Sequence, residues 1–313
     1  MPPIIFFYFY AHARLGNRMF QYLMGRVLQA HAPDVILAGC KLPEWGVDHP
    51  EISDKLDRER VIVADHVFPF RQLTERLRSG AGIDVCVSNL STRMEYYANH
   101  LALAREIFPI DPNLRIGYGP EHIVFNLRIG DIYGGLHPNY TVLPIRFYIF
   151  LSRKTGLKPV FIGELDDNDY TRALRIAFPE APFVHNENPL DDFNMVRTSA
   201  VVVPSVSTFC WLAAWLSSTA RQIHFPIIGM YNPNDRPDID LLPVQDQRYT
   251  FYSFPRERWE GRQDQIYRKI AGEGFFEPIQ APRLYKCRAT IRAWREGRLP
   301  SGLSVWRGLR SSL

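Results

Sequence analysis

The sequence predicts an α/β protein with two lobes, each built around a parallel sheet, that face a central cleft. Short apolar runs of strand length alternate with amphipathic segments of helix length, which is the pattern of βαβ units. Pro, Gly and Asn interrupt this alternation over residues 109–120. The chain has 313 residues, which suits two domains of about 150 residues each.

The first half opens on a continuous apolar run at residues 4–10, as expected of a strand buried on both faces. Apolar residues at helical spacing then predict a helix over residues 19–30. The same two patterns predict strands at 35–37, 61–64 and 84–87, and helices at 71–77 and 95–107. The interrupted segment that follows is the predicted linker between the lobes.

The second half repeats the alternation. It predicts strands at residues 122–126, 159–163, 183–185, 200–204 and 222–226, and helices at 144–154, 168–178, 190–198 and 208–217. Parallel sheets bind ligands at the carboxyl ends of their strands, so we expect the site in the cleft between the lobes. We place the N-terminal lobe at residues 1–118, the C-terminal lobe at 119–280 and a separate tail at 281–313.

The composition excludes several classes of protein. Hydrophobic residues make up 46% and charged residues 22% of the chain, which excludes intrinsic disorder. The four cysteines form no CxxC pair, which argues against a structural zinc site and a disulfide framework. No apolar run approaches the ~20 residues that span a bilayer, and the opening run lacks the marks of a signal peptide. We therefore expect a cytoplasmic protein.

The C-terminal tail is strongly basic. From residue 282 onward it holds eight basic residues and one acidic residue, while the formal net charge of the whole chain is +4. Apolar residues such as Ile291 and Trp294 recur there at three- and four-residue spacing. Two interpretations remain open. The tail packs back on the lobes as a helix, or it contacts an anionic surface and places the protein peripherally on the inner face of the membrane.

Three strand-to-helix turns carry glycine or polar residues. At the first, Gly16 and Asn17 stand where the chain leaves the opening strand and begins a helix. A residue without a side chain allows a ligand to approach the backbone, and a helix N-terminus favours an anion. The alternative is a tight turn with a helix cap, because one glycine is weaker than a full GxGxxG pattern.

The second turn follows the strand at residues 122–126 and contains Arg128, Gly130 and Asp131. An arginine directly after a buried strand is costly unless it meets a fixed anion. Gly130 lets the chain turn, and Asp131 is placed to orient the guanidinium group or to accept a proton. The alternative is a structural ion pair between Arg128 and Asp131.

The third turn contains Ser205, Ser207 and Thr208, between a buried strand and an apolar helix. Helix capping explains one hydroxyl and leaves backbone N–H groups to hold a phosphate. A cluster of three hydroxyls predicts a cradle for a diphosphate. Asp191 and Asp192 open the preceding helix, where one is expected to cap the helix and the other to contact a ribose or a base edge.

Together these turns resemble the α-1,2-fucosyltransferase family (glycosyltransferase family 11) and, more distantly, the α-1,6-fucosyltransferases. The family's opening turn and helix match LGN at residues 15–17 and MFQY at 19–22. Its central His-x-Arg-Arg-Gly-Asp motif stands here as NLRIGD at residues 126–131. Its Ser-x-Ser-Thr-Phe motif, the most specific of the three, matches residues 205–209. The resemblance runs in order over residues 4–216.

The resemblance implies a GT-B fold with two Rossmann-like lobes, the acceptor on the N-terminal side and the nucleotide sugar in the C-terminal lobe. It implies an inverting enzyme that takes L-fucose from GDP-β-L-fucose and needs no metal or other cofactor. The acceptor would be a hydroxyl group of an oligosaccharide or of a lipid-linked glycan. No nucleic-acid partner is expected.

The resemblance also assigns roles to the matching positions. Arg128 matches the family arginine that contacts the donor diphosphate, and Asp192 matches an aspartate near the nucleoside. Ser207 and Thr208 match residues on the phosphate side. The remaining predicted donor-site residues are Gly16, Asn17, Asn126, Ser205 and Phe209.

An inverting transfer needs a base for the proton of the acceptor hydroxyl, and three residues just beyond strand ends are candidates. These are Asp131, His137 and Glu164. One alternative is a glycosyltransferase for another nucleotide sugar, with Mg²⁺ or Mn²⁺ carried by Asp167 and Asp169, although acidic residues also suit a helix start. Asn126 replaces the family's His and Ile129 its second Arg, which favours another alternative, a non-catalytic nucleotide- or sugar-binding relative.

Overall fold

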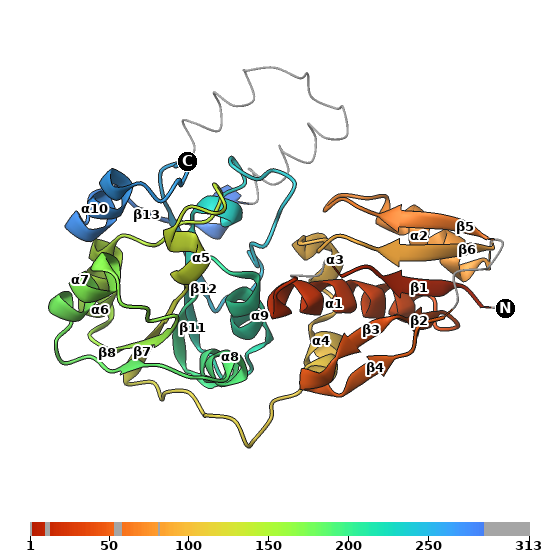
Figure 1. The fold of residues 1–313 in the computed structure, drawn as a ribbon, viewed down its shortest axis with the longest axis horizontal. Helices are drawn as coiled ribbons and strands as arrows, with labels where there is room; N and C mark the ends of the chain where they lie inside the picture. The colour runs from red at the N-terminus through yellow and green to blue at the C-terminus, as the bar shows by residue number, and fades with distance from the viewer. Residues whose placement is uncertain (1, 10–12, 53–57, 81, 285–313) are drawn as a thin grey trace, which may run out of the picture. The chain divides into compact units, whose positions relative to one another are not determined.

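The computed structural model describes residues 2–9, 13–52, 58–80 and 82–284, and it divides the chain into two compact units (Figure 1). The first unit runs to Ile110 and takes in Asp238–Leu241. The second unit runs over Asp111–Pro237 and continues from Leu242. Each unit contains a sheet with parallel strands and helices, which confirms the predicted α/β class. Both predictions for the basic tail fall on residues 285–313, outside the described residues.

The sheet of the first unit is parallel throughout and has the order β2-β1-β6-β5. Its strands are β1 (Ile4–Phe7), β2 (Ile36–Ala38), β5 (Glu59–Val63) and β6 (Ile83–Val87). Its helices are α1 (Leu15–His31), α2 (Phe70–Arg78), α3 (Met94–Tyr97) and α4 (Leu101–Ile107). A separate antiparallel pair, β3 (Cys40–Leu42) and β4 (Val47–His49), is joined by the 3-10 turn η1 (Pro43–Trp45).

Two features of the first unit differ from the prediction. The helix predicted over residues 95–107 is two helices, α3 and α4, because the chain turns around Asn99, a weak helix former, where His100 N–H donates to the Tyr97 carbonyl. The segment Asp238–Leu241 returns from far along the sequence, since Asp240 N–H donates to the Thr92 carbonyl. A contact between segments so far apart in the sequence leaves no local sequence pattern from which it could be predicted.

The second unit has a seven-stranded sheet of order β13-β12-β11-β10-β7-β8-β9, and its neighbours are parallel except for β12 and β13. The strands are β7 (His122–Leu127), β8 (Lys158–Gly163), β9 (Phe183–Val184), β10 (Val201–Val203), β11 (Gln222–Ile227), β12 (Tyr249–Ser253) and β13 (Glu277–Ile279). The helices are α5 (Gly130–Tyr133), α6 (Ile145–Thr155), α7 (Asp169–Ala177), α8 (Pro189–Thr198), α9 (Thr208–Leu216) and α10 (Gln263–Ala271). A 3-10 turn, η2 (Gly229–Tyr231), follows β11.

Helices cover both faces of this larger sheet, as parallel crossover connections require. Helices α6, α7 and α10 pack against one another on one face, and α8 packs against α9 on the other (Figure 1). Strand β10 is buried along its whole length, as a continuous apolar run predicts. The predicted alternation ended at residue 226, whereas the chain continues through β12, α10 and β13, and the two strands extend the sheet.

The second part of the predicted linker is fastened to α8. Gly117 N–H donates to Thr198 Oγ1 at 2.7 Å, and Tyr118 N–H donates to Ser199 Oγ at 3.0 Å. These side chains meet backbone donors that lie outside any strand or helix. The linker therefore belongs to the second unit at this point. Across the described residues, no helix is both long and apolar enough to cross a membrane.

Candidate functional site

The larger sheet contains a point where the chain reverses the direction in which it adds strands. From β7 the chain adds β8 and β9 on one side, and it then returns to add β10, β11 and β12 on the other. Open parallel sheets bind ligands outside the carboxyl ends of the strands at such a switch point. Arg128 directly follows β7, and Ser205 comes shortly after β10. The second and third predicted turns therefore meet at the switch point.

Arg128 is held at the switch point by groups from three directions. Its Nη1 donates to Ser207 Oγ at 3.3 Å, and its Nη2 donates to Asp131 Oδ2 at 3.1 Å. The guanidinium carbon lies 5.1 Å from the centre of the Tyr140 ring, within cation–π range. The side chain is 14% exposed, and its Nε–H is buried without a hydrogen-bond partner among the described residues. A fixed, largely buried cation with an unmet donor suits an anionic ligand.

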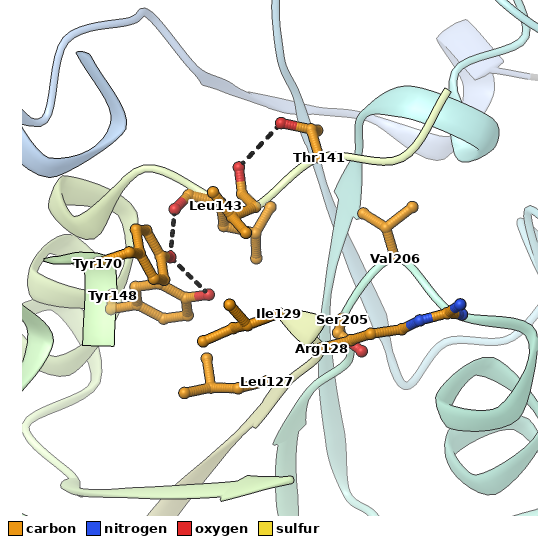
Figure 2. A pocket seen from close by; sticks show the side chains of 10 residues that line it. Leu127, Arg128, Ile129, Thr141, Leu143, Tyr148, Tyr170, Ser205 and Val206 are labelled. Carbon is orange, nitrogen blue, oxygen red and sulfur yellow. Dashed lines mark hydrogen bonds between the residues drawn. The ribbon is translucent and has the colours of Figure 1, made fainter. Parts of the chain in front are cut away.

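Ile129 points away from Arg128. Figure 2 shows Leu127 and Ile129 directed toward Tyr148 and Tyr170, while Arg128 extends to the other side. Ile129 is 1% exposed, and the pocket that these side chains line has room for a water-sized molecule rather than a sugar. Ile129 is therefore part of the core.

The third turn joins the same cluster through hydroxyl groups. Ser205 Oγ donates to Asn126 Oδ1 at 2.6 Å, which ties the end of β7 to the turn after β10. Ser207 N–H donates to Tyr231 Oη at 3.0 Å, and this hydroxyl donates to the Ser207 carbonyl at 2.8 Å. The expectation that the backbone N–H groups of this turn are left for a phosphate is therefore wrong for Ser207, because the buried Tyr231 hydroxyl accepts that hydrogen bond.

Thr208 and Phe209 begin α9. Thr208 is 3% exposed, so its hydroxyl lies in the interior of the second unit. The Phe209 ring packs on Phe193 of α8, with 4.8 Å between the ring centres. Phe209 thus fixes α9 against the helix that carries Asp192, and its part in donor binding stays a prediction.

Asp192 lies in the first turn of α8 in a partly buried position. Burial raises the pKa of its carboxyl group to about 6, and the negative charges of Asp191 and Glu164 act in the same direction. Asn186 Nδ2 donates to Asp192 Oδ1 at 2.7 Å and opposes that rise. This carboxyl group is therefore able to change its charge near neutral pH.

Neither of the two aspartates caps α8, which corrects the expectation for Asp191 and Asp192. The N-cap is Asn188, whose Oδ1 accepts from Leu190 N–H at 3.0 Å. Asp191 Oδ1 accepts from Arg115 N–H at 2.8 Å, so it fastens the linker instead. Asparagine is as good a cap as aspartate, and the Pro that follows it favours this start.

The three candidate bases differ in position and in contacts. Glu164 directly follows β8 and Asp131 lies in α5 shortly after β7, whereas His137 lies in the loop after α5, so the expectation that it stands just beyond a strand end is wrong. Asp131 is ion-paired as described above. Glu164 Oε2 accepts from Ile129 N–H at 2.9 Å, which holds it beside the second turn. His137 is exposed, and its ring lies 5.5 Å from the Tyr140 ring. All three stay candidates for the base.

Asp167 and Asp169, the two predicted metal ligands at the start of α7, are both bound by an arginine. Arg172 Nη1 donates to Asp167 Oδ1 at 2.8 Å, and its Nη2 donates to Asp169 Oδ1 at 2.7 Å. Asn168 between them caps the helix by accepting from Thr171 N–H. Within the described ranges, no group of three or more His, Cys, Asp or Glu side chains is placed to hold a metal ion. These contacts are those of an acidic helix start.

Gly16 and Asn17 belong to the first unit, in the first turn of α1 rather than ahead of it. Gln21, from the same motif, donates through Nε2 to the Tyr8 carbonyl at 2.8 Å and to the Val87 carbonyl at 3.5 Å. It therefore joins the carboxyl ends of β1 and β6, where this sheet also reverses direction. The part of Gly16 and Asn17 in donor binding stays a prediction.

Comparisons with known proteins give a similarity in structure and none in sequence. No protein-family model matches the chain, and no curated protein matches it. Among solved structures, the chain is similar to the E. coli heptosyltransferase WaaC with ADP. The TM-score is 0.43 at 11% sequence identity, over 92% of this chain and 99% of that one. A function for the chain therefore has to be supported by the residues of its own site.

Two tyrosines complete the site although neither stands at a strand end. Tyr140 lies in the loop after α5, and Tyr231 ends η2, beyond the last predicted strand. Both occur next to asparagine in loops that also contain proline, as HPNY and MYNPN. An aromatic residue in such a loop is the local signal that could have marked them, but it is common in ordinary turns.

Proposed function

We propose that the chain is an inverting glycosyltransferase that moves L-fucose from GDP-fucose to a hydroxyl group of a glycan, without a metal ion. The observation that supports this most is Arg128, a largely buried cation with an unmet Nε–H donor at the switch point of a parallel sheet. Glycosyl transfer builds negative charge on the departing nucleoside diphosphate. A preorganised cation at that position stabilises the transition state.

Other residues of the second unit are assigned to the remaining parts of a nucleotide. The motif resemblance assigns Ser207 and Thr208 to the phosphate side, and the Ser207 hydroxyl contacts Arg128. Asp192 and Asn186 offer hydrogen-bonding groups for a ribose or a base edge. GDP-fucose as the donor is inferred from the motif resemblance, and glycosyl transfer in general is supported by the chemistry of Arg128.

The transfer itself is a displacement at the anomeric carbon of the sugar. The acceptor oxygen bonds to this carbon while the bond to the diphosphate breaks, and the acceptor proton passes to a base. Asp131, His137 and Glu164 are the candidates for that base. The acceptor is an oligosaccharide or a lipid-linked glycan, and the second would suit a basic tail in contact with a membrane.

The proposal is tested by the consumption of nucleotide sugars by the purified chain in excess EDTA. We expect GDP-fucose to be consumed at a rate that EDTA does not change. Arg128→Ala should lower kcat by about 10²-fold or more, the scale of losing one preorganised transition-state contact. Arg172→Ala is the matched control, because it removes an arginine that binds the acidic helix start.

The other outcomes contradict the donor, the metal independence or the transfer itself. Consumption of a UDP-sugar but not of GDP-fucose would overturn the donor while glycosyl transfer stands. Loss of activity in EDTA, restored by Mg²⁺ or Mn²⁺, would overturn metal independence. Near-normal turnover by Arg128→Ala, or no consumption of any nucleotide sugar, would overturn the proposed function.

A further inference from the structure

Tyr140 contacts Arg128 through the face of its ring, whereas Ser207 and Asp131 contact Arg128 through hydrogen bonds. Ser207 and Asp131 bind the Nη atoms, which fixes the guanidinium group at its edge. The Tyr140 ring lies against the guanidinium carbon at 5.1 Å, which is a contact with the π face of the ring. A long arginine side chain has several rotatable bonds, so edge contacts alone leave it free to tilt. A ring against the group restricts that tilt and keeps water from it.

The loop that presents Tyr140 is itself held by two other segments. Met230 N–H donates to the Asn139 carbonyl at 2.6 Å, from the η2 side. Trp259 is fully buried, and its N–H donates to the Pro138 carbonyl at 3.0 Å while its Nε1 donates to the Ile132 carbonyl at 2.6 Å. The ring of Tyr140 is therefore carried by a backbone that is bonded on both sides.

The η2 segment is also connected to Arg128, through Ser207. Tyr231, the neighbour of Met230 in η2, is hydrogen-bonded to Ser207, and Ser207 accepts from Arg128. The contacts thus form a closed ring, from Arg128 through Ser207, η2 and the Tyr140 loop back to Arg128. All of its members belong to the second unit. A closed ring of contacts holds a side chain more tightly than separate contacts do.

We propose that Tyr140 is a positioning residue that holds the guanidinium group of Arg128 in the orientation that meets the diphosphate. This rests on the proposed function, in which Arg128 stabilises the departing diphosphate. The ring acts through Arg128 and does not touch the reacting atoms. Its aromatic face is the required feature, and its hydroxyl group is not.

The test is steady-state kinetics of Tyr140→Leu and Tyr140→Phe. Losing a cation–π contact that is shielded from water lowers an equilibrium or rate constant by about tenfold. Tyr140→Leu should therefore lower kcat by about tenfold, with little change in the KM for the acceptor. Tyr140→Phe keeps the ring and should retain most of the activity. Tyr133→Leu, an aromatic residue of α5 beside the acidic start of α7, is the matched control and should behave as the wild type.

A double-mutant cycle separates positioning from a general structural role. With Arg128 replaced by alanine, Tyr140→Leu should cause no further loss of kcat, because the group that it positions is absent. A full tenfold loss in that background would overturn the proposal, as would Tyr140→Phe being as impaired as Tyr140→Leu. Coupling of Tyr140→Leu to His137→Gln instead of to Arg128→Ala would also overturn it, because the ring then acts through His137.

These outcomes are distinct from a failure of the proposed function. If Arg128→Ala lowers kcat and Tyr140→Leu does not, the positioning role is wrong and the proposed function stands. If no nucleotide sugar is consumed, the same cycle is measured on the dissociation constant for GDP. Independent effects of the two substitutions on that constant would then overturn the positioning role as well.

Discussion

His224 should make the free energy of unfolding fall in mild acid. Its side chain is 1% exposed, with Nδ1 at 2.9 Å from Tyr252 Oη and an Nε2 that has no hydrogen-bond partner in the described part of the chain. Lys154 Nζ donates to the same hydroxyl at 3.4 Å. Burial, and after it the positive charge of Lys154, lower the pKa of His224 from 6.5 to about 4. The folded protein therefore keeps this ring neutral at a pH where the unfolded chain protonates it.

The size of the effect follows from the difference between the two pKa values. Above pH 6.5, the unfolded value, the ring is neutral in both states and the pH dependence from this group is absent. Between pH 6.5 and about 4 only the unfolded chain binds the proton, so the free energy of unfolding falls by about 1.4 kcal/mol per pH unit. The loss is about 2 kcal/mol at pH 5 and approaches about 3 kcal/mol below pH 4.

The assay is urea unfolding at pH 7.5 and pH 5, followed by tryptophan fluorescence, to which Trp211, Trp215 and Trp259 of the second unit contribute. His224→Gln removes the titrating ring, so the wild type should lose about 2 kcal/mol more than this variant between the two pH values. His137→Gln removes an exposed histidine and should follow the wild type. Equal losses in the wild type and in His224→Gln would refute the reasoning.

Two further predictions concern the site. Burial raises the pKa of Asp192 from 3.8 to about 6, so the stability that this group gives below pH 3.8 is lost as the pH rises through 6. We expect Asp192→Asn to raise Tm at pH 7.5, by an amount that shrinks as the pH falls toward 3.8. An unchanged or lower Tm at pH 7.5 would contradict this. For the base, we expect one of Asp131→Asn, His137→Gln and Glu164→Gln to lower kcat by about 10²-fold or more and to remove the acid limb of the pH–rate profile. If none of them loses kcat, the base lies elsewhere or is supplied by the substrate.

The elements around the site were predictable because local patterns mark them. Strands β7 and β10 are short apolar runs that end in polar turns, and both were predicted close to their observed bounds. Arg128 and Ser207 could be selected because each departs from that apolar pattern at a strand end. Their meeting follows from the parallel sheet, since the carboxyl ends of neighbouring strands lie at one edge.

The remaining contacts depend on packing across long separations in the sequence. Tyr140 and Tyr231 reach the site from loops, and a loop sequence does not state which strand end its side chains approach. The cap of α8 was assigned to an aspartate because Asn188, Asp191 and Asp192 are all suitable in type. Only the linker contact, Asp191 with Arg115, shows why that aspartate is engaged elsewhere.

The proposed function depends most directly on Arg128 binding the diphosphate of a nucleotide sugar. Isothermal titration with GDP, UDP, dTDP and CMP identifies the nucleotide, and we expect GDP to bind best. The direct measurement then compares GDP with guanosine, each titrated into the wild type and into Arg128→Ala. We expect Arg128→Ala to weaken the binding of GDP by about tenfold or more, the worth of a charged hydrogen bond, and to leave the binding of guanosine unchanged. Equal affinity of the two proteins for GDP, or no binding of any nucleoside diphosphate to the wild type, would contradict it.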